Sequence, residues 1–133
     1  MNAVFVDTVG LLALWDANDQ WHSAAEATFA TLHRDKVLLT TTSFVLLECA
    51  NAAARRPYRQ AVERLRERLE SNNILVFPTD TDWRQAWAAY RQSDAGQPGI
   101  VDYVSFAVMR RLDIRQAFTN DHHFQEAGFE TLF

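Results

Sequence analysis

The stretch VFVDTVG, residues 4–10, is an apolar run that ends on one carboxylate, Asp7, and continues into a predicted helix. Asp is a common residue at helix starts because its side chain accepts hydrogen bonds from the free N–H groups of the first turn, a contribution of about 1 kcal/mol. A carboxylate directly after a buried strand also fits a second role, as one of several acids around a metal ion. The positions of the chain's other acids decide between these roles.

Strands that alternate with helices are predicted along the whole chain from its hydrophobic periodicity. The expected strands are 2–6, 36–41, 74–77 and 116–119, with an edge strand at 130–133. The expected helices are 8–15, 20–34, 43–56, 57–72, 79–93, 100–112 and 121–128, and Pro57 is placed in the first turn of helix 57–72. This order predicts an α/β fold, a small mainly parallel sheet of four or five strands with helices on both faces. Ligands of such sheets bind beyond the carboxyl ends of the strands.

The size and composition of the chain suit one domain, residues 1–133, because 48% of its 133 residues are hydrophobic. No stretch approaches the roughly 18 uninterrupted apolar residues that a membrane span needs, and the first residues lack a secretory signal pattern, so a cytoplasmic location is expected. The single cysteine, Cys49, is predicted to be a small buried hydrophobe. A net charge of −4 argues against holding nucleic acid by bulk electrostatics, so any binding of phosphate must be local.

Four carboxylates fall where such a sheet would bring them together. Asp7 and Asp121 follow the first and fourth predicted strands, and Asp102 opens an apolar helix. Glu48 lies in the middle of helix 43–56, on a stripe that we expect to face the apolar side, where a charged glutamate needs a cation. Helix capping for Asp7 and Asp121, a favourable helix dipole for Asp102 and an ion pair for Glu48 remain alternative explanations. Together the four would repel one another, and Mg²⁺ or Mn²⁺ would relieve that repulsion.

The metal hypothesis predicts phosphoryl hydrolysis, because a divalent ion inverts the local charge and lets a phosphate approach an acidic protein. The chain also resembles a known family, the PIN domain, and in particular the toxin ribonucleases of VapBC-type toxin and antitoxin pairs. The resemblance runs from Val4 to Phe133. It is carried by the segments FVDT (5–8), TTSFVLLECANAA (41–53), IVDYVSFAVMRRL (100–112) and AFTNDHHFQEAGF (117–129).

The resemblance implies a metal-dependent endoribonuclease that cuts single-stranded or looped RNA. It also implies a homodimer and a cognate antitoxin whose tail covers the cleft. The resemblance implies that four acids hold Mg²⁺ or Mn²⁺: Asp7, Glu48, Asp102 and Asp121. It places the Thr119 hydroxyl beside them, and Thr8 and His123 are possible supporting residues.

Three positions depart from the family pattern. Pro98 and Gly99 stand near the place where family members often carry a serine before the third acid, and Val9 replaces a small polar residue. Val9 also argues against a haloacid-dehalogenase-like phosphatase, which needs a second aspartate two residues after the first. The remaining alternative of another class is a PIN-like module that binds RNA or protein without catalysis.

Two further groups of residues are interpreted as structural or peripheral. Trp83, Trp87 and Tyr90 recur at helical spacing, which favours a core or dimer contact over a base-stacking platform. His122 and His123 stand beside Asp121, but no second His or Cys pair has the spacing that would complete a tetrahedral zinc site.

Overall fold

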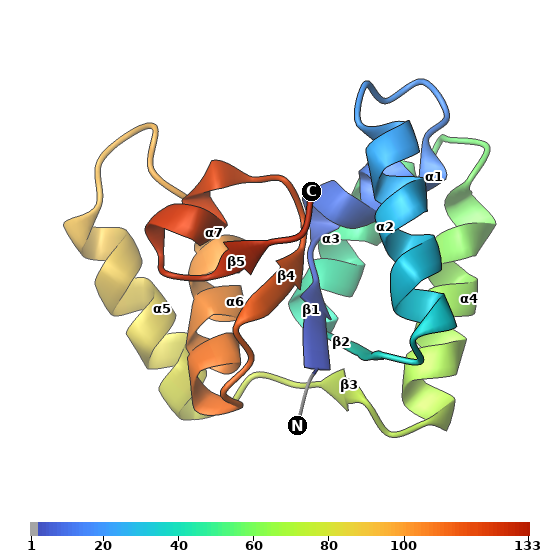
Figure 1. Ribbon diagram of the computed structural model, residues 1–133. Coiled ribbons are helices and arrows are strands. Elements are labelled where there is room, and N and C mark those ends of the chain that lie inside the picture. The colour runs from blue at the N-terminus through green and yellow to red at the C-terminus, as the bar shows by residue number, and fades with distance from the viewer. Residues whose placement is uncertain (1–2) are drawn as a thin grey trace.

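The computed structural model describes residues 3–133 and forms one α/β unit (Figure 1). Strands and helices alternate as the sequence predicts. The strands are β1 (Ala3–Val6), β2 (Leu38–Thr42), β3 (Leu75–Val76), β4 (Gln116–Phe118) and β5 (Glu130–Thr131). The helices are α1 (Thr8–Trp15), α2 (His22–Arg34), α3 (Ser43–Ala53), α4 (Arg59–Ser71), α5 (Asp80–Gln92), α6 (Ile100–Arg111) and α7 (His122–Glu126).

The five strands form one parallel sheet in the order β3-β2-β1-β4-β5, which confirms the predicted fold class. From β1 the chain moves to β2 and β3 on one side and later returns to β4 and β5 on the other. Because such crossovers are right-handed, the two directions place their helices on opposite faces of the sheet. Figure 1 shows α2 and α4 on one side and α5, α6 and α7 on the other. The order therefore reverses between β1 and β4, the place where parallel sheets bind ligands.

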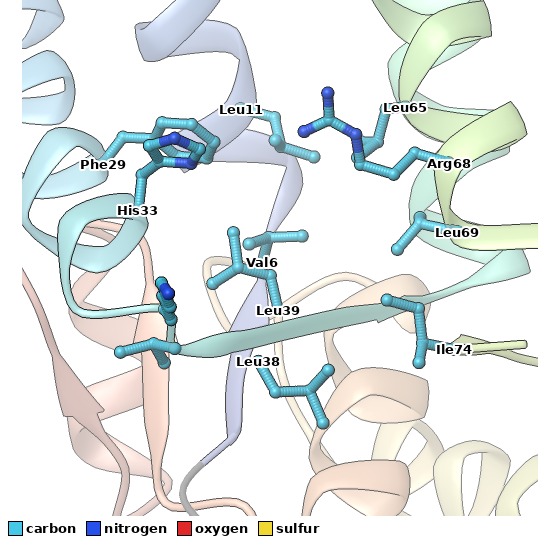
Figure 2. Close-up of a pocket in the computed structure, with 12 residues that line it drawn as sticks. Val6, Leu11, Phe29, His33, Leu38, Leu39, Leu65, Arg68, Leu69 and Ile74 are labelled. Carbon is cyan, nitrogen blue, oxygen red and sulfur yellow. The ribbon is translucent and has the colours of Figure 1, made fainter. Parts of the chain in front are cut away.

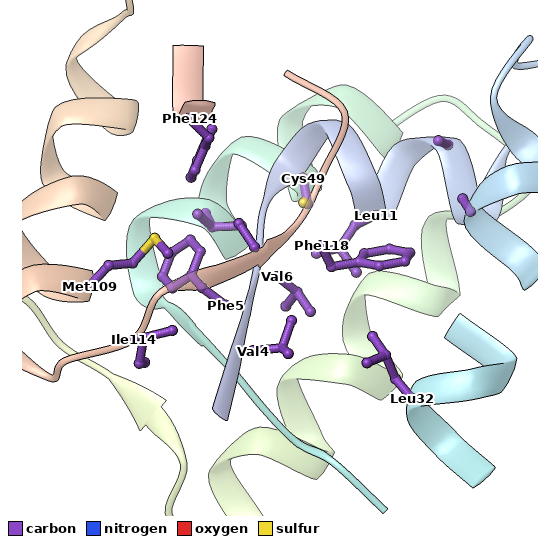
Figure 3. Packing of buried hydrophobic residues seen from close by; sticks show 14 of the residues in the cluster. Val4, Phe5, Val6, Leu11, Leu32, Cys49, Met109, Ile114, Phe118 and Phe124 are labelled. Carbon is purple, nitrogen blue, oxygen red and sulfur yellow. The ribbon is translucent and has the colours of Figure 1, made fainter. Parts of the chain in front are cut away.

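The core lies against the neighbouring strands β1 and β4 (Figure 3). All four residues of β1 are buried, as expected for a strand covered on both faces. Phe5, Phe118 and Phe124 are fully buried and, with Met109 of α6, fill the space between the sheet and the helices. Cys49 is also fully buried, and burial raises the pKa of its thiol to about 12, so it acts as the small hydrophobe that we predicted.

Some predicted element boundaries are wrong around Pro57. Helix α3 ends at Ala53 and α4 begins only at Arg59, so Pro57 lies outside the first turn of α4. Backbone bonds from the Arg56 N–H to the Ala53 carbonyl and from the Arg59 N–H to the Arg56 carbonyl form a separate turn here. The residue before a proline avoids the helical region, which explains why neither helix continues through this turn. The predicted first strand also included residue 2, which lies outside the described residues.

An apolar cavity of about 380 Å³ lies between α2 and α4, over β2 (Figure 2). Phe29 of α2, Leu65 of α4 and Leu39 of β2 line it, and the charged Arg68 stands at its edge. This cavity is on the face of the sheet opposite to α5, α6 and α7. Separately, none of the helices within residues 3–133 is both long and apolar enough to cross a membrane.

Candidate metal centre

Asp7 lies at the carboxyl end of β1, where it caps α1 and faces the end of β4. Its side chain is 1% exposed, and its Oδ2 accepts hydrogen bonds from the Val9 N–H at 3.3 Å and from the Thr119 hydroxyl at 3.0 Å. Its Oδ1 is buried and has no hydrogen-bond partner among the described residues. A buried carboxylate oxygen without a partner is costly, so this atom points to a cation that would complete its environment.

The Thr119 hydroxyl links Asp7 to Asp121. Thr119 directly follows β4 and is fully buried. Besides donating to Asp7, its Oγ1 accepts a hydrogen bond from the Asp121 N–H at 3.1 Å. Asp121 caps α7, and its Oδ1 accepts the His123 N–H at 2.9 Å. Asp7 and Asp121 are therefore both helix caps, as one of the two interpretations of the sequence predicts. Each cap uses one carboxylate oxygen, so the other oxygen can still bind a ligand.

Asp102 completes a group of three carboxylates. It lies in the first turn of α6, and Asp7, Asp102 and Asp121 each offer an oxygen within 4.8 Å of the others. Burial, together with the charge of Asp102, raises the pKa of Asp7 to about 7. Burial, together with the charges of Asp121 and Glu48, raises the pKa of Asp102 to about 7. Among residues 3–133, no Lys or Arg lies within 4.0 Å of these acids to neutralise them.

The residues fit a hard divalent cation. Three carboxylates that converge on one point, one of them with an orphaned buried oxygen, form the oxygen ligand set that Mg²⁺ and Mn²⁺ prefer. The raised pKa values of Asp7 and Asp102 have the same cause, because negative charges held close together in a poorly solvated place resist ionisation. A bound cation would reverse this effect and keep both groups charged.

Glu48 lies at the edge of the group, and one expectation about it is wrong. We predicted that it faces the apolar side of its helix, but Glu48 is exposed on α3. Helical periodicity misassigned it because Leu47, the preceding residue, is itself 66% exposed, so α3 does not follow a simple inside and outside pattern. Its Oε1 accepts a hydrogen bond from the Thr8 hydroxyl at 2.5 Å, and its charge contributes to the raised pKa of Asp102. Glu48 is near the three aspartates but outside the convergent group.

His123 connects the group to the loop before α6, a contact that sequence reasoning missed. Its Nδ1 lies 3.2 Å from Asp121 Oδ1, and its Nε2 lies 3.3 Å from the Gly96 carbonyl. No local pattern could reveal the second contact, because it joins residues 27 positions apart. His122 is 70% exposed. Asp121 and the two histidines also converge within 4.8 Å, but this second group shares Asp121 with the first.

Asp82, in the first turn of α5, forms a buried ion pair that sequence reasoning missed. It is 1% exposed and holds the Arg111 guanidinium through both carboxylate oxygens, at 2.8–3.1 Å. It also forms a capping box with Thr79, and Arg111 lowers its pKa below the usual range despite burial. This ion pair ties the start of α5 to the end of α6 and leaves Arg111 unavailable to the metal centre.

Comparisons with known proteins agree with this fold and site. The family model of the PIN domain matches residues 4–130, and the chain belongs to the PIN domain family. It is similar to the 23S rRNA-specific endonuclease VapC20 of two Mycobacterium tuberculosis strains, with 33% identity over 127 residues that cover 95% of each protein. A crystal structure of M. tuberculosis VapC20, described as a toxin that cleaves the sarcin-ricin loop, matches with a TM-score of 0.77 and 30% identity over 95% of each chain. These findings confirm the resemblance that the sequence segments carry.

Proposed function

We propose that this chain is a metal-dependent endoribonuclease, the toxin of a toxin–antitoxin pair. The observation that carries the proposal is the convergence of Asp7, Asp102 and Asp121 at the point where the strand order reverses, with the buried Oδ1 of Asp7 left without a partner. The chain is similar to the RNA endonuclease VapC20 over 95% of both proteins, and this similarity supports the same reaction class.

Mg²⁺ or Mn²⁺ at these three aspartates would supply the positive charge that activates water and stabilises a phosphodiester under attack. Two threonine hydroxyls of the chain orient the acids around this position. Thr119 holds Oδ2 of Asp7 and thereby leaves Oδ1 free for the cation. Thr8 holds Oε1 of Glu48, so its other oxygen is free to orient a water and accept its proton at the edge of the group.

The substrate class follows from charge and exposure. With a net charge of −4, the chain has no bulk attraction for RNA, so the cation would be the main attraction for the phosphate backbone. Glu48 and Asp121 reach the surface from one edge of the sheet, which leaves room for a looped or single-stranded segment. VapC20 is named for cleavage of 23S rRNA, and a structured rRNA loop is therefore the first substrate class to test.

The partners that we propose are a cognate antitoxin and a second copy of this chain. The similarity to a toxin supports an antitoxin, which would act with the chain in the cytoplasm. The half-exposed aromatic side chains of Trp83, Trp87 and Tyr90 support a homodimer, since they are too exposed to be core residues.

The decisive experiment compares cleavage by the wild-type protein with that of Asp7→Asn on 23S rRNA fragments in Mn²⁺ or Mg²⁺. We expect the substitution to lower the cleavage rate more than about 100-fold, because the amide cannot replace the charged oxygen at the cation. Excess chelator should abolish wild-type cleavage, and added Mn²⁺ should restore it.

Asp80→Asn is the matched control, because Asp80 is exposed in the first turn of α5 and outside the convergent group. It should cleave at the wild-type rate. Cleavage that persists in chelator would overturn the metal mechanism. RNA binding without cleavage in any divalent metal would instead favour the non-catalytic binding module.

A further inference from the structure

A cavity of about 280 Å³ lies beside α6 and α7, and one of its lining residues, His123, contacts Asp121 of the metal centre. Its wall combines the aromatic rings of Tyr103 and Phe106 with the guanidinium of Arg110, the carboxylate of Glu126 and the imidazole of His123. Such a wall, with flat apolar surfaces and a few polar groups of both signs, is typical of a site for a planar polar ligand. None of the proposed steps at the metal centre uses Arg110 or Glu126.

Arg110 is held in place but not neutralised. One Nη2 N–H donates to the Ala127 carbonyl at 3.0 Å, and the guanidinium carbon lies 5.9 Å from the ring centre of Phe106 and 5.4 Å from that of Phe129. Within residues 3–133 it forms no ion pair with a carboxylate. A guanidinium has five donors, so the groups that remain can serve a ligand with no loss of the existing contacts.

Glu126, in the last turn of α7, offers hydrogen-bond acceptors where Arg110 offers donors. Its carboxylate lines the same cavity as Arg110, yet the two do not come within 4.0 Å of each other, and Glu126 pairs with no other cation of the described chain. Both side chains are exposed, and a ligand that has acceptors on one edge and donors on another can bind the two of them at once.

Guanine has this pattern. Its O6 and N7 accept from an arginine on one edge, while its N1–H and N2–H groups donate to a carboxylate on another. The π-face of the base can also stack on the partly exposed ring of Tyr103, which is how proteins hold unpaired RNA bases. Adenine, cytosine and uracil each lack either the two acceptors on one edge or the two donors on the other.

Two of the residues that line the cavity also lie next to acids of the metal centre. His123 lines the cavity and also touches Asp121 Oδ1 at 3.2 Å, and Tyr103 follows Asp102 directly in α6. We propose that this cavity binds a guanine base of the RNA beside the phosphate that is cleaved, with Arg110 and Glu126 as its specificity-determining residues. This inference rests on the proposed ribonuclease function.

The test uses a pool of short RNAs with randomised central nucleotides, cleaved by the full chain in Mn²⁺, with the cleavage sites mapped by sequencing. We expect guanine to be enriched at one fixed position next to the cut. At that position, 7-deazaguanine, which lacks N7, and inosine, which lacks the N2 amino group, should each lower the wild-type cleavage rate about tenfold.

Arg110→Ala should lose the guanine enrichment and no longer distinguish guanine from 7-deazaguanine, and Glu126→Gln should no longer distinguish guanine from inosine. The matched controls Arg64→Ala and Glu67→Gln change the same charges on exposed positions of α4, across the sheet, and should keep both preferences. Thermal melting of each variant shows that the fold is kept.

The outcomes separate the two proposals. If the wild-type protein cleaves no RNA of the pool in Mn²⁺ or Mg²⁺, the ribonuclease function itself fails. If it cleaves without a guanine preference, or if Arg110→Ala and Glu126→Gln both keep the wild-type preference, the guanine site is wrong while the ribonuclease function stands.

Discussion

At the scale of single residues, the metal centre depends on one hydroxyl that serves two acids. Thr119 donates to Asp7 Oδ2 and accepts the Asp121 N–H, so it fixes the relative position of two aspartates that are 114 positions apart in the chain. Because Oδ2 of Asp7 receives two hydrogen bonds and Oδ1 none, the carboxylate is oriented before any cation arrives. Such preorganisation costs stability, since the buried charge is only partly compensated.

The first prediction follows from this cost. In chelator at pH 8, Asp7→Asn should raise the free energy of unfolding by about 1–3 kcal/mol, because the pKa of Asp7 rises from 3.8 to about 7 on folding. Between these values the folded state binds more protons than the unfolded state, so wild-type stability falls as pH increases. The gain should therefore be absent below pH 3.8, grow up to pH 7 and then remain constant. Urea denaturation across this pH range measures it.

Asp80→Asn is again the control, because Asp80 is exposed and a carboxylate in a first helix turn is mildly favourable. It should give no stabilisation at any pH. An Asp7→Asn variant that is less stable than the wild type at pH 8 without metal would show that the buried charge is compensated by contacts other than those described.

The sequence identified the acids but not all of their surroundings. Asp7, Asp102 and Asp121 could be found because each stands at the end of a strand or the start of a helix, positions that an alternating pattern brings to one edge of the sheet. The exposure of Glu48 and the contact of His123 with the Gly96 carbonyl could not be found, because they depend on how helices and loops are rotated relative to one another.

At the scale of elements, the approach of α1 to β4 places the first aspartate beside the others. Gly10 makes this approach possible: a Cβ atom there would lie 2.0 Å from the Phe118 carbonyl oxygen. The same close contact allows the Asp7 N–H to reach the Phe118 carbonyl at 3.4 Å. A glycine inside a helix normally lowers its stability, so steric necessity at the junction is the physical reason for this one.

The second prediction tests this junction. Gly10→Ala should lower the free energy of unfolding by about 1–3 kcal/mol, because α1 must move away from β4 to accommodate the methyl group. Cleavage activity should fall as well, since the start of α1 carries Asp7. Gly99→Ala is the comparison, since its Cβ meets no atom within 4 Å and should cost no more than about 1 kcal/mol as a weaker helix cap. Equal unfolding free energies for Gly10→Ala and the wild type would contradict the steric argument.

Most elements were predictable because their periodicity and their caps agree. The Thr79 cap of α5 and the Asp7 cap of α1 are local signals, and the structure contains both. The boundary at Pro57 was misplaced because proline tolerates either the first helical turn or the turn before it, and only the backbone bonds of that turn distinguish the two. The ion pair of Asp82 could not be predicted from local patterns, because its partner, Arg111, is 29 positions away.

At the scale of the whole molecule, large exposed apolar side chains gather on α5 and on the neighbouring part of α3. The outer side of α5 presents an aromatic stripe, Trp83, Trp87 and Tyr90, whose rings contact edge to face at centre distances of 5.8 and 5.4 Å. The stripe continues through Phe44 of α3, and Leu47 of the same helix is 66% exposed. Large apolar side chains gathered in this way on a folded surface usually mark an interface with another protein.

The third prediction is that this stripe joins two copies of the chain. Trp87, at the centre of the stripe, is 39% exposed and contacts both of its aromatic neighbours, so Trp87→Glu would place a charge in the middle of the interface. We expect the dimer dissociation constant, measured by sedimentation equilibrium, to increase at least about tenfold, because buried aromatic residues dominate interface energetics. Trp21→Glu is the matched control, as Trp21 is 46% exposed beside α2, on the opposite face of the sheet, and it should leave the dimer unchanged. A wild-type protein that stays monomeric at all concentrations, or a Trp87→Glu variant that dimerises as well as the control, would exclude the stripe as the dimer contact.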